Sequence, residues 1–226
     1  SVSFAANAGF PASSAAAQAA GFGDVDGDGD ADLVIANNGA NTLLLNDGLG
    51  NFRSSPWNFP TVGDSTATTA LALGDVNGDG TLDLILANRI GYATGAIQLF
   101  INNGSGMFVS SHFNGSSVLT NALALGDFDG DGALDLVVGN SGLDELFINN
   151  GSGTFAKSLT FVSDDTSTTT AVQLGDVDGD GALDIVFGKN TAEGIGGAEV
   201  LLGDGAGGFR LQLLQGGSAA RTNAVS

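Results

Sequence analysis

The sequence has no cysteine among its 226 residues, and it contains only one histidine, one tryptophan and one tyrosine. Without cysteine the chain forms no disulfide and no thiolate metal site. A zinc or copper site rich in imidazole is also excluded, because His112 stands alone. A histidine-dependent triad would have to use His112, whose neighbouring serines lie in no GxSxG motif. The sequence therefore argues against catalysis that depends on cysteine or histidine.

Basic residues and long apolar runs are also scarce. Six Lys and Arg stand against 25 Asp and Glu, which gives a net charge of −19. Such a charge argues against nucleic acid or an anionic membrane as a partner. No apolar run approaches the roughly 20 residues of a membrane-spanning helix, so we expect no membrane insertion.

The acid is concentrated in one stretch that occurs four times. The copies read GDVDGDGDADLVIAN from Gly23, GDVNGDGTLDLILAN from Gly74, GDFDGDGALDLVVGN from Gly126 and GDVDGDGALDIVFGK from Gly175. They hold 16 of the 25 acidic residues, almost without nearby Lys or Arg. Clustered carboxylates repel one another unless a cation binds among them.

The first aspartates of the copies are 51, 52 and 49 residues apart, and a second motif follows each copy. A period near 50 indicates a solenoid, propeller or array. The second motif is a short apolar strand, a turn rich in Asn, Asp and Gly, and a Phe, as in LFINNGSGTF from Leu146. Residues 122–125 before the third acidic loop alternate, and residues 136–138 after it are continuously apolar. Each repeat thus contains four strands, which predicts an all-β chain built as a β-propeller of four four-stranded blades.

The motif GDxxGDGxxDL followed by NxGxGxF resembles the FG-GAP or VCBS repeat, which is found in integrin α-subunit propellers and many bacterial surface proteins. The resemblance covers all four copies and implies calcium-binding blades in a protein that is secreted or on the cell surface. We expect a single propeller domain over 1–226, with blades at about 19–60, 68–116, 120–165 and 169–214.

Each acidic loop has the spacing of an oxygen-ligand site. With Asp127 as position 1, the carboxylates of Asp129, Asp131 and Asp135 fall at positions 3, 5 and 9, and the carbonyl of Ala133 at position 7. Several carboxylate and carbonyl oxygens around two glycines suit calcium; magnesium is possible but prefers fewer protein ligands. The loop is not an EF-hand, because position 12 is apolar in every copy.

By the resemblance, four calcium ions are expected, one in each blade. The predicted ligands are Asp24, Asp26, Asp28, Asp30 and Asp32; Asp75, Asn77, Asp79, Thr81 and Asp83; Asp127, Asp129, Asp131, Ala133 and Asp135; and Asp176, Asp178, Asp180, Ala182 and Asp184. Position 7 acts through its carbonyl, and Asp30 adds a carboxylate beside the first site. Asn77 removes one negative charge from the second site, which we predict to be the weakest.

Two features concern how the blades assemble. The segment between the last loop Asp and the next turn alternates between 14 and 19 residues along the chain, which favours a compact four-bladed unit made of a duplicated pair. Residues 1–10 contain a surplus strand, which we expect to lie along an outer edge or pair with another subunit.

We expect a non-enzymatic structural or adhesive module that binds calcium. Its partners would be further copies of itself in an oligomer or filament, or a cell-surface protein or glycan. A glycan-binding lectin is the alternative. Tyr92 and Arg89, in the long segment of the second repeat, are the best candidates to face a ligand. Trp57 lies between the last strand of the first repeat and the first strand of the second. Asn103, Asn114 and Asn150 lie in N-x-[ST] sequons, although turn geometry explains two of them.

Overall fold

A computed structural model describes residues 16–56, 67–90, 95–111, 113, 115–161, 167–190 and 196–212. The described residues form sixteen strands in four sheets of four strands each, with no helix, as the repeat predicts. The surplus strand expected at residues 1–10, together with Trp57, Tyr92, His112 and Asn114, lies outside the described residues. Among those described, no helix has the length and apolarity needed to cross a membrane.

Each sheet is an antiparallel meander in chain order and is called a blade below. Blade 1 contains β1 (Ala17–Gly23), β2 (Asp32–Asn37), β3 (Thr42–Asn46) and β4 (Phe52–Ser54). Blade 2 contains β5 (Ala67–Gly74), β6 (Asp83–Arg89), β7 (Gly95–Asn102) and β8 (Phe108–Ser111). Blade 3 contains β9 (Thr120–Gly126), β10 (Asp135–Asn140), β11 (Asp144–Asn149) and β12 (Phe155–Phe161). Blade 4 contains β13 (Thr168–Gly175), β14 (Asp184–Asn190), β15 (Gly196–Gly203) and β16 (Phe209–Gln212).

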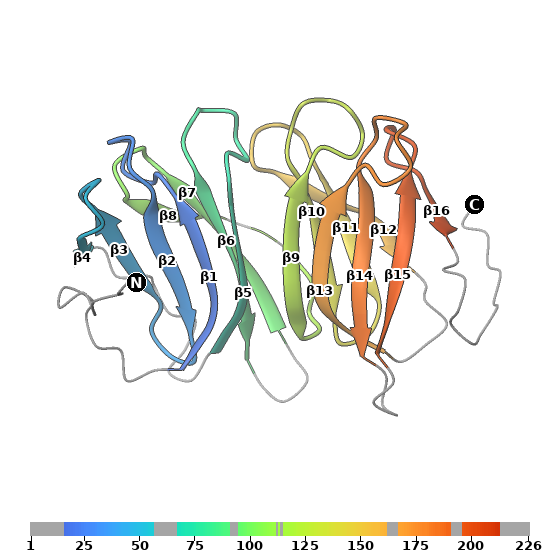
Figure 1. Ribbon diagram of the computed structural model, residues 1–226, viewed down its shortest axis with the longest axis horizontal. Coiled ribbons are helices and arrows are strands. Elements are labelled where there is room, and N and C mark those ends of the chain that lie inside the picture. The colour runs from blue at the N-terminus through green and yellow to red at the C-terminus, as the bar shows by residue number, and fades with distance from the viewer. Residues whose placement is uncertain are drawn as a thin grey trace, which may run out of the picture.

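The first strand of each blade packs on the first strand of the next, so that β1 contacts β5, β5 contacts β9 and β9 contacts β13. No comparable packing joins β13 back to β1 among the described residues. Figure 1 accordingly shows the four blades side by side, with blade 1 at one end and blade 4 at the other. The four blades predicted from the sequence are therefore present as a β-propeller whose described blades lie in an open arc (Figure 1).

The hydrophobic core is divided into three clusters, one between each pair of neighbouring blades. Leu84, Leu86 and Phe100 of blade 2 are at most 1% exposed and pack against Val34 and Val25 of blade 1. Burying a side chain of this size stabilises the fold by about 1.5–3 kcal/mol. The clusters explain the continuous apolar runs that follow the acidic loops of blades 2 and 3, since β6 and β10 have a neighbouring sheet on both faces.

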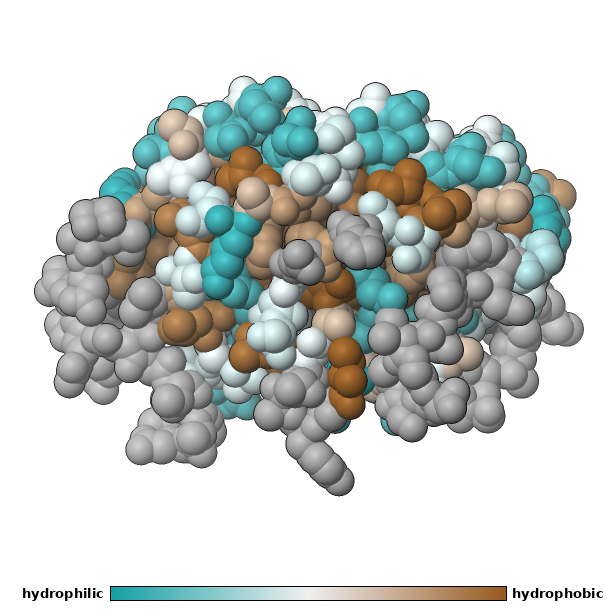
Figure 2. Space-filling model, turned by 180° about the vertical axis from the view of Figure 1, so that it is seen from behind, coloured by the Kyte–Doolittle hydropathy of each residue, from teal (hydrophilic) through white to brown (hydrophobic). Residues whose placement is uncertain are grey.

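One rim of the arc carries all the acidic loops. Because the strands alternate in direction, the loop after the first strand of each blade and the turn after the third strand emerge at the same edge (Figure 1). The space-filling view from behind shows hydrophilic residues gathered along that upper edge (Figure 2). The acidic loop of each blade thus lies beside its own Asn-Gly or Asp-Gly turn.

Candidate metal centres

The aspartate at position 1 holds each acidic loop in shape. In the third loop, Asp127 Oδ1 accepts a hydrogen bond from Gly130 N at 2.8 Å, and Oδ2 accepts one from Gly132 N at 3.0 Å. Both glycines have positive φ angles, 76° and 90°, which residues with a side chain rarely adopt. Asp24, Asp75 and Asp176 make the same pair of bonds in the other loops. The repeated D-x-x-G-x-G spacing therefore specifies the loop conformation itself.

The aspartate at position 9 joins the loop to the turn. Asp135 is fully buried; its Oδ2 accepts from Phe128 N at 2.9 Å and its Oδ1 from Asn149 N, the end of the third strand, at 2.8 Å. Asp32, Asp83 and Asp184 repeat these bonds. The sequence predicts position 9 as a metal ligand but not its hydrogen bond to the end of the third strand. The turn that follows every acidic loop was a signal that could have indicated this bond.

Burial of the position 9 carboxyl also affects its ionisation. Removal from water raises the pKa of Asp83 and of Asp135 above the ordinary aspartate value, and the neighbouring loop carboxylates add to the rise. The hydrogen bonds from the backbone amides act in the opposite direction without cancelling it. A cation beside these groups would favour their charged form.

Three of the loops bring three carboxylates together. In each, the aspartates at positions 1, 3 and 9 offer oxygens that all lie within 4.8 Å of one another. The groups are Asp24, Asp26 and Asp32; Asp127, Asp129 and Asp135; and Asp176, Asp178 and Asp184. Such a set of carboxylate oxygens with no nitrogen or sulfur ligand suits a hard cation such as calcium.

The first group gives a further sign that a cation fits. Asp26 Oδ1 is buried and has no hydrogen-bond partner among the described residues. Its removal from water, followed by the charges of Asp32 and Asp28, raises the pKa of Asp26. The nearest cationic group is Arg53 Nη2, which lies 4.0 Å from Asp26 Oδ2. In the fourth loop Arg210 Nη2 lies 3.1 Å from Asp178 Oδ2, and the third loop has no ion pair within the described residues.

The second loop differs because Asn77 replaces the position 3 aspartate. Asn77 Nδ2 donates to Asp79 Oδ2 at 2.9 Å, and Thr81 Oγ1 donates to Asp79 Oδ1 at 2.6 Å. The bond from Thr81, then that from Asn77, lowers the pKa of Asp79. Part of the oxygen set of this loop is therefore engaged within the loop, and the weaker binding of this site stays a prediction.

Positions 5 and 7 lie outside the three groups. Asp28, Asp79, Asp131 and Asp180 each accept a bond from the backbone N–H two residues later, at position 7. Asp30 directs its carboxylate at Gly48 of the neighbouring turn, so close that a Cβ on that glycine would lie 2.5 Å from Asp30 Oδ2. The position 7 carbonyls of Asp30, Thr81, Ala133 and Ala182 remain predicted ligands.

Two of the sequon asparagines serve the turns. Asn103 Oδ1 accepts from Ser105 N at 3.0 Å, and Asn150 Oδ1 accepts from Ser152 N at 3.0 Å. The side chain thus closes a local turn, which accounts for Asn at these positions without glycosylation. The neighbouring asparagines Asn102 and Asn149 have a larger role, because each donates to a carbonyl of the preceding blade.

Comparison with solved structures finds proteins of similar fold. A lectin of Agrocybe aegerita, described as recognising non-reducing terminal N-acetylglucosamine, has a solved structure that is similar with a TM-score of 0.53 and 24% identity over 84% of this chain and 50% of its own. A Photorhabdus luminescens Tc holotoxin matches with a TM-score of 0.44 and 21% identity over 87% of this chain and 9% of its own. This chain therefore spans half the length of the lectin, and at such identity the likeness concerns the fold alone.

No curated protein matches the chain. The family model for the FG-GAP-like repeat matches three overlapping stretches, residues 24–86, 75–138 and 127–187. Each stretch runs from the first aspartate of one acidic loop into the strand after the next loop, so the matches cover most of the chain. With its four repeated blades and loops, the chain belongs to the FG-GAP-like repeat family.

Proposed function

We propose that this protein is a non-enzymatic structural or adhesive module, secreted or on the cell surface, whose blades are stabilised by calcium. The observation that carries the proposal is the repeated group of three aspartates with oxygens within 4.8 Å of one another. The same arrangement in three blades supports the same role in each. The rim that carries these aspartates is separate from the apolar cores between the blades.

Calcium would be held by the position 1, 3 and 9 carboxylates of blades 1, 3 and 4. In blade 2 the corresponding residues are Asp75, Asn77 and Asp83, with one charge fewer. The bound ion would supply positive charge to a loop that holds several carboxylates. Sites of extracellular modules typically have dissociation constants of about 10⁻⁴–10⁻³ M, so each would stabilise the fold by roughly 1–2 kcal/mol at a few millimolar calcium.

The positions of the carboxylates also favour a structural over a catalytic role. The position 1 and position 9 side chains accept backbone hydrogen bonds through both oxygens, and the position 9 groups are buried. A general acid or base must instead reach a proton of the substrate. These aspartates are committed to the loop, which supports a non-enzymatic assignment.

Titration of the metal-free protein with calcium tests the proposal. We expect heat in a calorimeter and a rise in melting temperature, both larger for calcium than for magnesium at equal concentration. The change Asp129→Asn should remove the heat of one site, whereas Asp47→Asn, an exposed turn residue, should leave the heat unchanged. The proposal fails if calcium produces neither heat nor a shift in melting temperature.

The expected self-association through the surplus strand remains a proposal, because residues 1–10 lie outside the described part of the chain. Removing residues 1–8 tests it, since the mass in solution should then fall. A chain that has the same mass with and without this segment would exclude the strand as the donor.

Glycan binding is the second candidate, and one feature of the rim favours it. A cavity of about 300 Å³ opens between blades 2 and 3. It is lined by Asp75, Val76, Gly78, Asp131, Gly132, Ala133, Asn150 and Gly151. Its lining offers carboxylates and backbone groups but no aromatic side chain. A glycan array with the calcium-loaded protein, repeated with Ala133→Trp to fill the cavity, would separate this function from a purely structural one.

A further inference from the structure

The three contacts between blades are built from the same positions. The residue before the glycine that opens each acidic loop is Leu73, Leu125 or Leu174 in blades 2 to 4, and it packs on the corresponding glycine of the preceding blade. A Cβ built on Gly74 would lie 2.8 Å from Leu125 Cδ1, and one on Gly126 would lie 2.9 Å from Leu174 Cδ1. In each contact a leucine side chain therefore packs on a glycine of the preceding blade.

The loop and the turn form the second part of every contact. Val25, directly after the first aspartate of its loop, is 1% exposed, and its carbonyl accepts from Gly106 N and from Asn102 Nδ2, both at 2.8 Å. Val76 is covered in the same way, and its carbonyl accepts from Asn149 Nδ2 at 2.7 Å. The acidic loop of one blade is thus covered by the turn of the next.

Blade 4 presents the first half of this contact with nothing on it. Val177 occupies the position of Val25 and Val76 but is 57% exposed. A Cβ built on Gly175, the counterpart of Gly74 and Gly126, would have no atom within 4 Å. The same local sequence that is buried in blades 1 to 3 is therefore open at the end of the arc.

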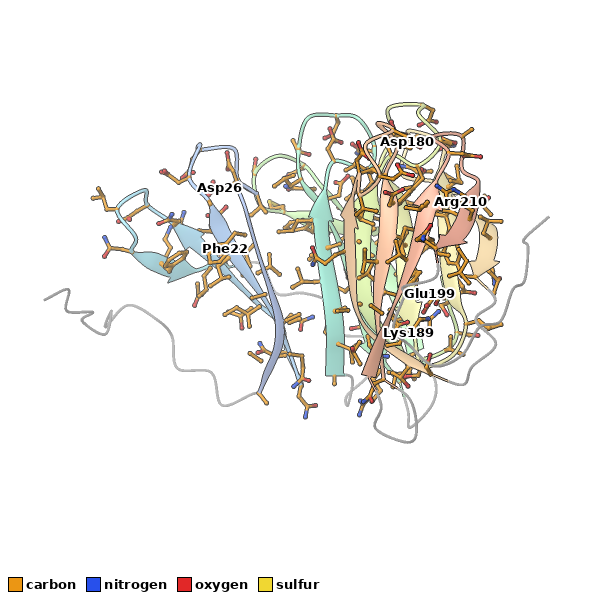
Figure 3. All side chains as sticks on the ribbon, turned by 45° about the vertical axis from the view of Figure 1, so that its right-hand side comes forward. Phe22, Asp26, Asp180, Lys189, Glu199 and Arg210 are labelled. Carbon is orange, nitrogen blue, oxygen red and sulfur yellow. The ribbon has the colours of Figure 1, made fainter. Side chains whose placement is uncertain are left out.

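Blade 1 presents the complementary half. Phe22 occupies the position of Leu73, Leu125 and Leu174 but is 66% exposed, and it lies on the sheet at the blade 1 end of the arc (Figure 3). Asn46 Nδ2 donates one hydrogen to Ala31 O at 3.1 Å. Its counterparts Asn102 and Asn149 also donate to the preceding blade, and the second amide hydrogen of Asn46 has no acceptor among the described residues.

The side chains at this end are also matched in size. In the three internal contacts a second leucine, such as Leu134 or Leu183, lies on the same glycine of the preceding blade. Blade 1 has Ala31 at that position, together with the larger Phe22. A larger ring beside a smaller neighbour keeps the total volume similar, so the end of blade 1 still fits the glycine surface of blade 4.

We propose that the end of blade 4 docks on the end of blade 1 of a second copy of this chain. In the register of the internal contacts, Phe22 of one copy would cover Gly175 of the other, and Asn46 Nδ2 would donate to Val177 O. The second copy is the occupant because both halves come from one chain and repeat a contact that the chain makes three times. Phe22, Asn46, Gly175 and Val177 are uncharged, but Asp178, the counterpart of Asp26 and Asp129, would lie beside the turn of blade 1 in this register. The net charge of −19 therefore opposes docking, and salt should weaken that repulsion.

Two different surfaces meet in such a contact, so it is heterologous. Repetition closes a ring of copies if the rotation allows and otherwise builds a filament. This proposal goes beyond the calcium assignment and does not depend on it, because Phe22, Asn46, Gly175 and Val177 are not among the predicted metal ligands.

Sedimentation velocity of the full chain over a range of concentrations, with calcium present, tests the proposal. The natural chain should associate, while Phe22→Asp and Val177→Asp should each be monomeric, since each has lost one half of the contact. Mixing the two variants should produce a one-to-one dimer that grows no further, because one intact pair of surfaces remains. Val109→Asp, which changes an exposed valine on β8 away from both ends, should associate like the natural chain.

Both end residues are exposed, so these variants should keep the circular dichroism spectrum of the monomer. Val177 lies between the predicted ligands Asp176 and Asp178, so the melting temperatures are compared in chelator. The proposal is overturned if the natural chain is monomeric throughout, or if it associates equally well with Phe22→Asp and Val177→Asp. It is also overturned if the two variants lose association but form no dimer on mixing, because like surfaces would then have been meeting.

Discussion

Lys189 of blade 4 forms a buried ion pair with Asp144 of blade 3. The lysine side chain also lies 3.3 Å from Glu199 Oε2, and Figure 3 shows these two residues together in blade 4. Asp144 accepts further bonds from Thr169 Oγ1 at 2.8 Å and from Asn140 N at 2.7 Å. Both partners are nearly inaccessible to water, so the charges depend on each other across the contact between the two blades.

The equivalent place between blades 1 and 2 is neutral. Asn41 Nδ2 donates to Thr68 Oγ1 at 2.9 Å, Thr68 Oγ1 donates to Asn88 Oδ1 at 2.7 Å, and Asn88 Nδ2 donates to Gln98 Oε1 at 2.9 Å. Equivalent positions thus form a charged network between blades 3 and 4 and an uncharged network between blades 1 and 2. This correspondence agrees with the duplicated pair that the alternating segment lengths predict.

Replacing Lys189 should therefore be costly. Lys189→Met leaves the carboxylate of Asp144 buried without a counter-charge, which typically costs about 3–5 kcal/mol. Urea denaturation in calcium measures the loss. The double change Lys189→Asn with Asp144→Asn reproduces residue types of the neutral network and should recover most of it. A loss below about 1 kcal/mol for Lys189→Met would contradict the role given to the pair.

A second prediction compares two equivalent glycines. A Cβ on Gly126 would lie 2.7 Å from Leu183 Cδ1 and 2.9 Å from Leu174 Cδ1, whereas one on Gly175 would meet no atom within 4 Å. Gly126→Ala should lower the free energy of unfolding by about 1–3 kcal/mol through overpacking. Gly175→Ala should leave it nearly unchanged when measured on the monomeric Phe22→Asp background. Equal effects of the two changes would show that blade contact is not the reason for the glycine.

The third prediction concerns the link between loop and turn. Asp135→Asn places an amide where Phe128 N and Asn149 N both need an acceptor, so one buried donor is left unsatisfied at a cost of about 1–3 kcal/mol. The matched change Asp131→Asn keeps an oxygen for Ala133 N at an exposed position and should cost less than about 0.5 kcal/mol. Thermal unfolding of the metal-free chains separates this effect from metal binding. Equal costs would argue against position 9 as a structural link.

The fourth prediction follows from the raised pKa values of Asp83 and Asp135, whose main cause is burial. A carboxyl with a higher pKa in the folded than in the unfolded protein binds protons more tightly when folded. Its contribution to stability is present at low pH and is lost as the pH rises through the folded-state pKa. The contribution of these groups to the stability of the metal-free protein should therefore fall as the pH rises above the ordinary aspartate pKa of about 4.

Calcium should reverse this trend, because its ligands must be ionised, so the stabilisation by calcium should grow over the same pH window. Melting temperatures measured in chelator and in calcium across the window test both effects. The decrease in chelator should be smaller for Asp135→Asn, which has lost one titrating group. A decrease of the same size in that variant would mean that other groups cause it.

Much of the fold could be predicted from the sequence, because it is repeated locally. The spacing of the aspartates and the strand–turn–Phe motif predict four sheets of four strands, and the structure confirms them. Spacing also predicts which aspartates share a loop, and positions 1, 3 and 9 do come together in three loops. These features depend on residues close in the chain, whose geometry is fixed by short-range bonds.

Contacts between repeats could not be predicted in the same way. Val25 and Val177 have the same local sequence, yet one is buried and the other exposed, because only the first has a following blade over it. Asp144 and Lys189 lie 45 residues apart, and nothing near either one indicates the other. The packing of large side chains of one blade on glycines of the preceding blade likewise depends on two repeats, and no single repeat specifies it.

The sequential packing of the blades has a consequence for how the molecule opens. Among the described strands, those of blades 2 and 3 pack on two neighbouring blades, whereas those of blades 1 and 4 pack on one. In such a linear array the stability of a unit depends on its nearest neighbours. Local unfolding should therefore begin at the two ends and leave β5, β6, β9 and β10 as the strands whose amide hydrogens exchange most slowly with water.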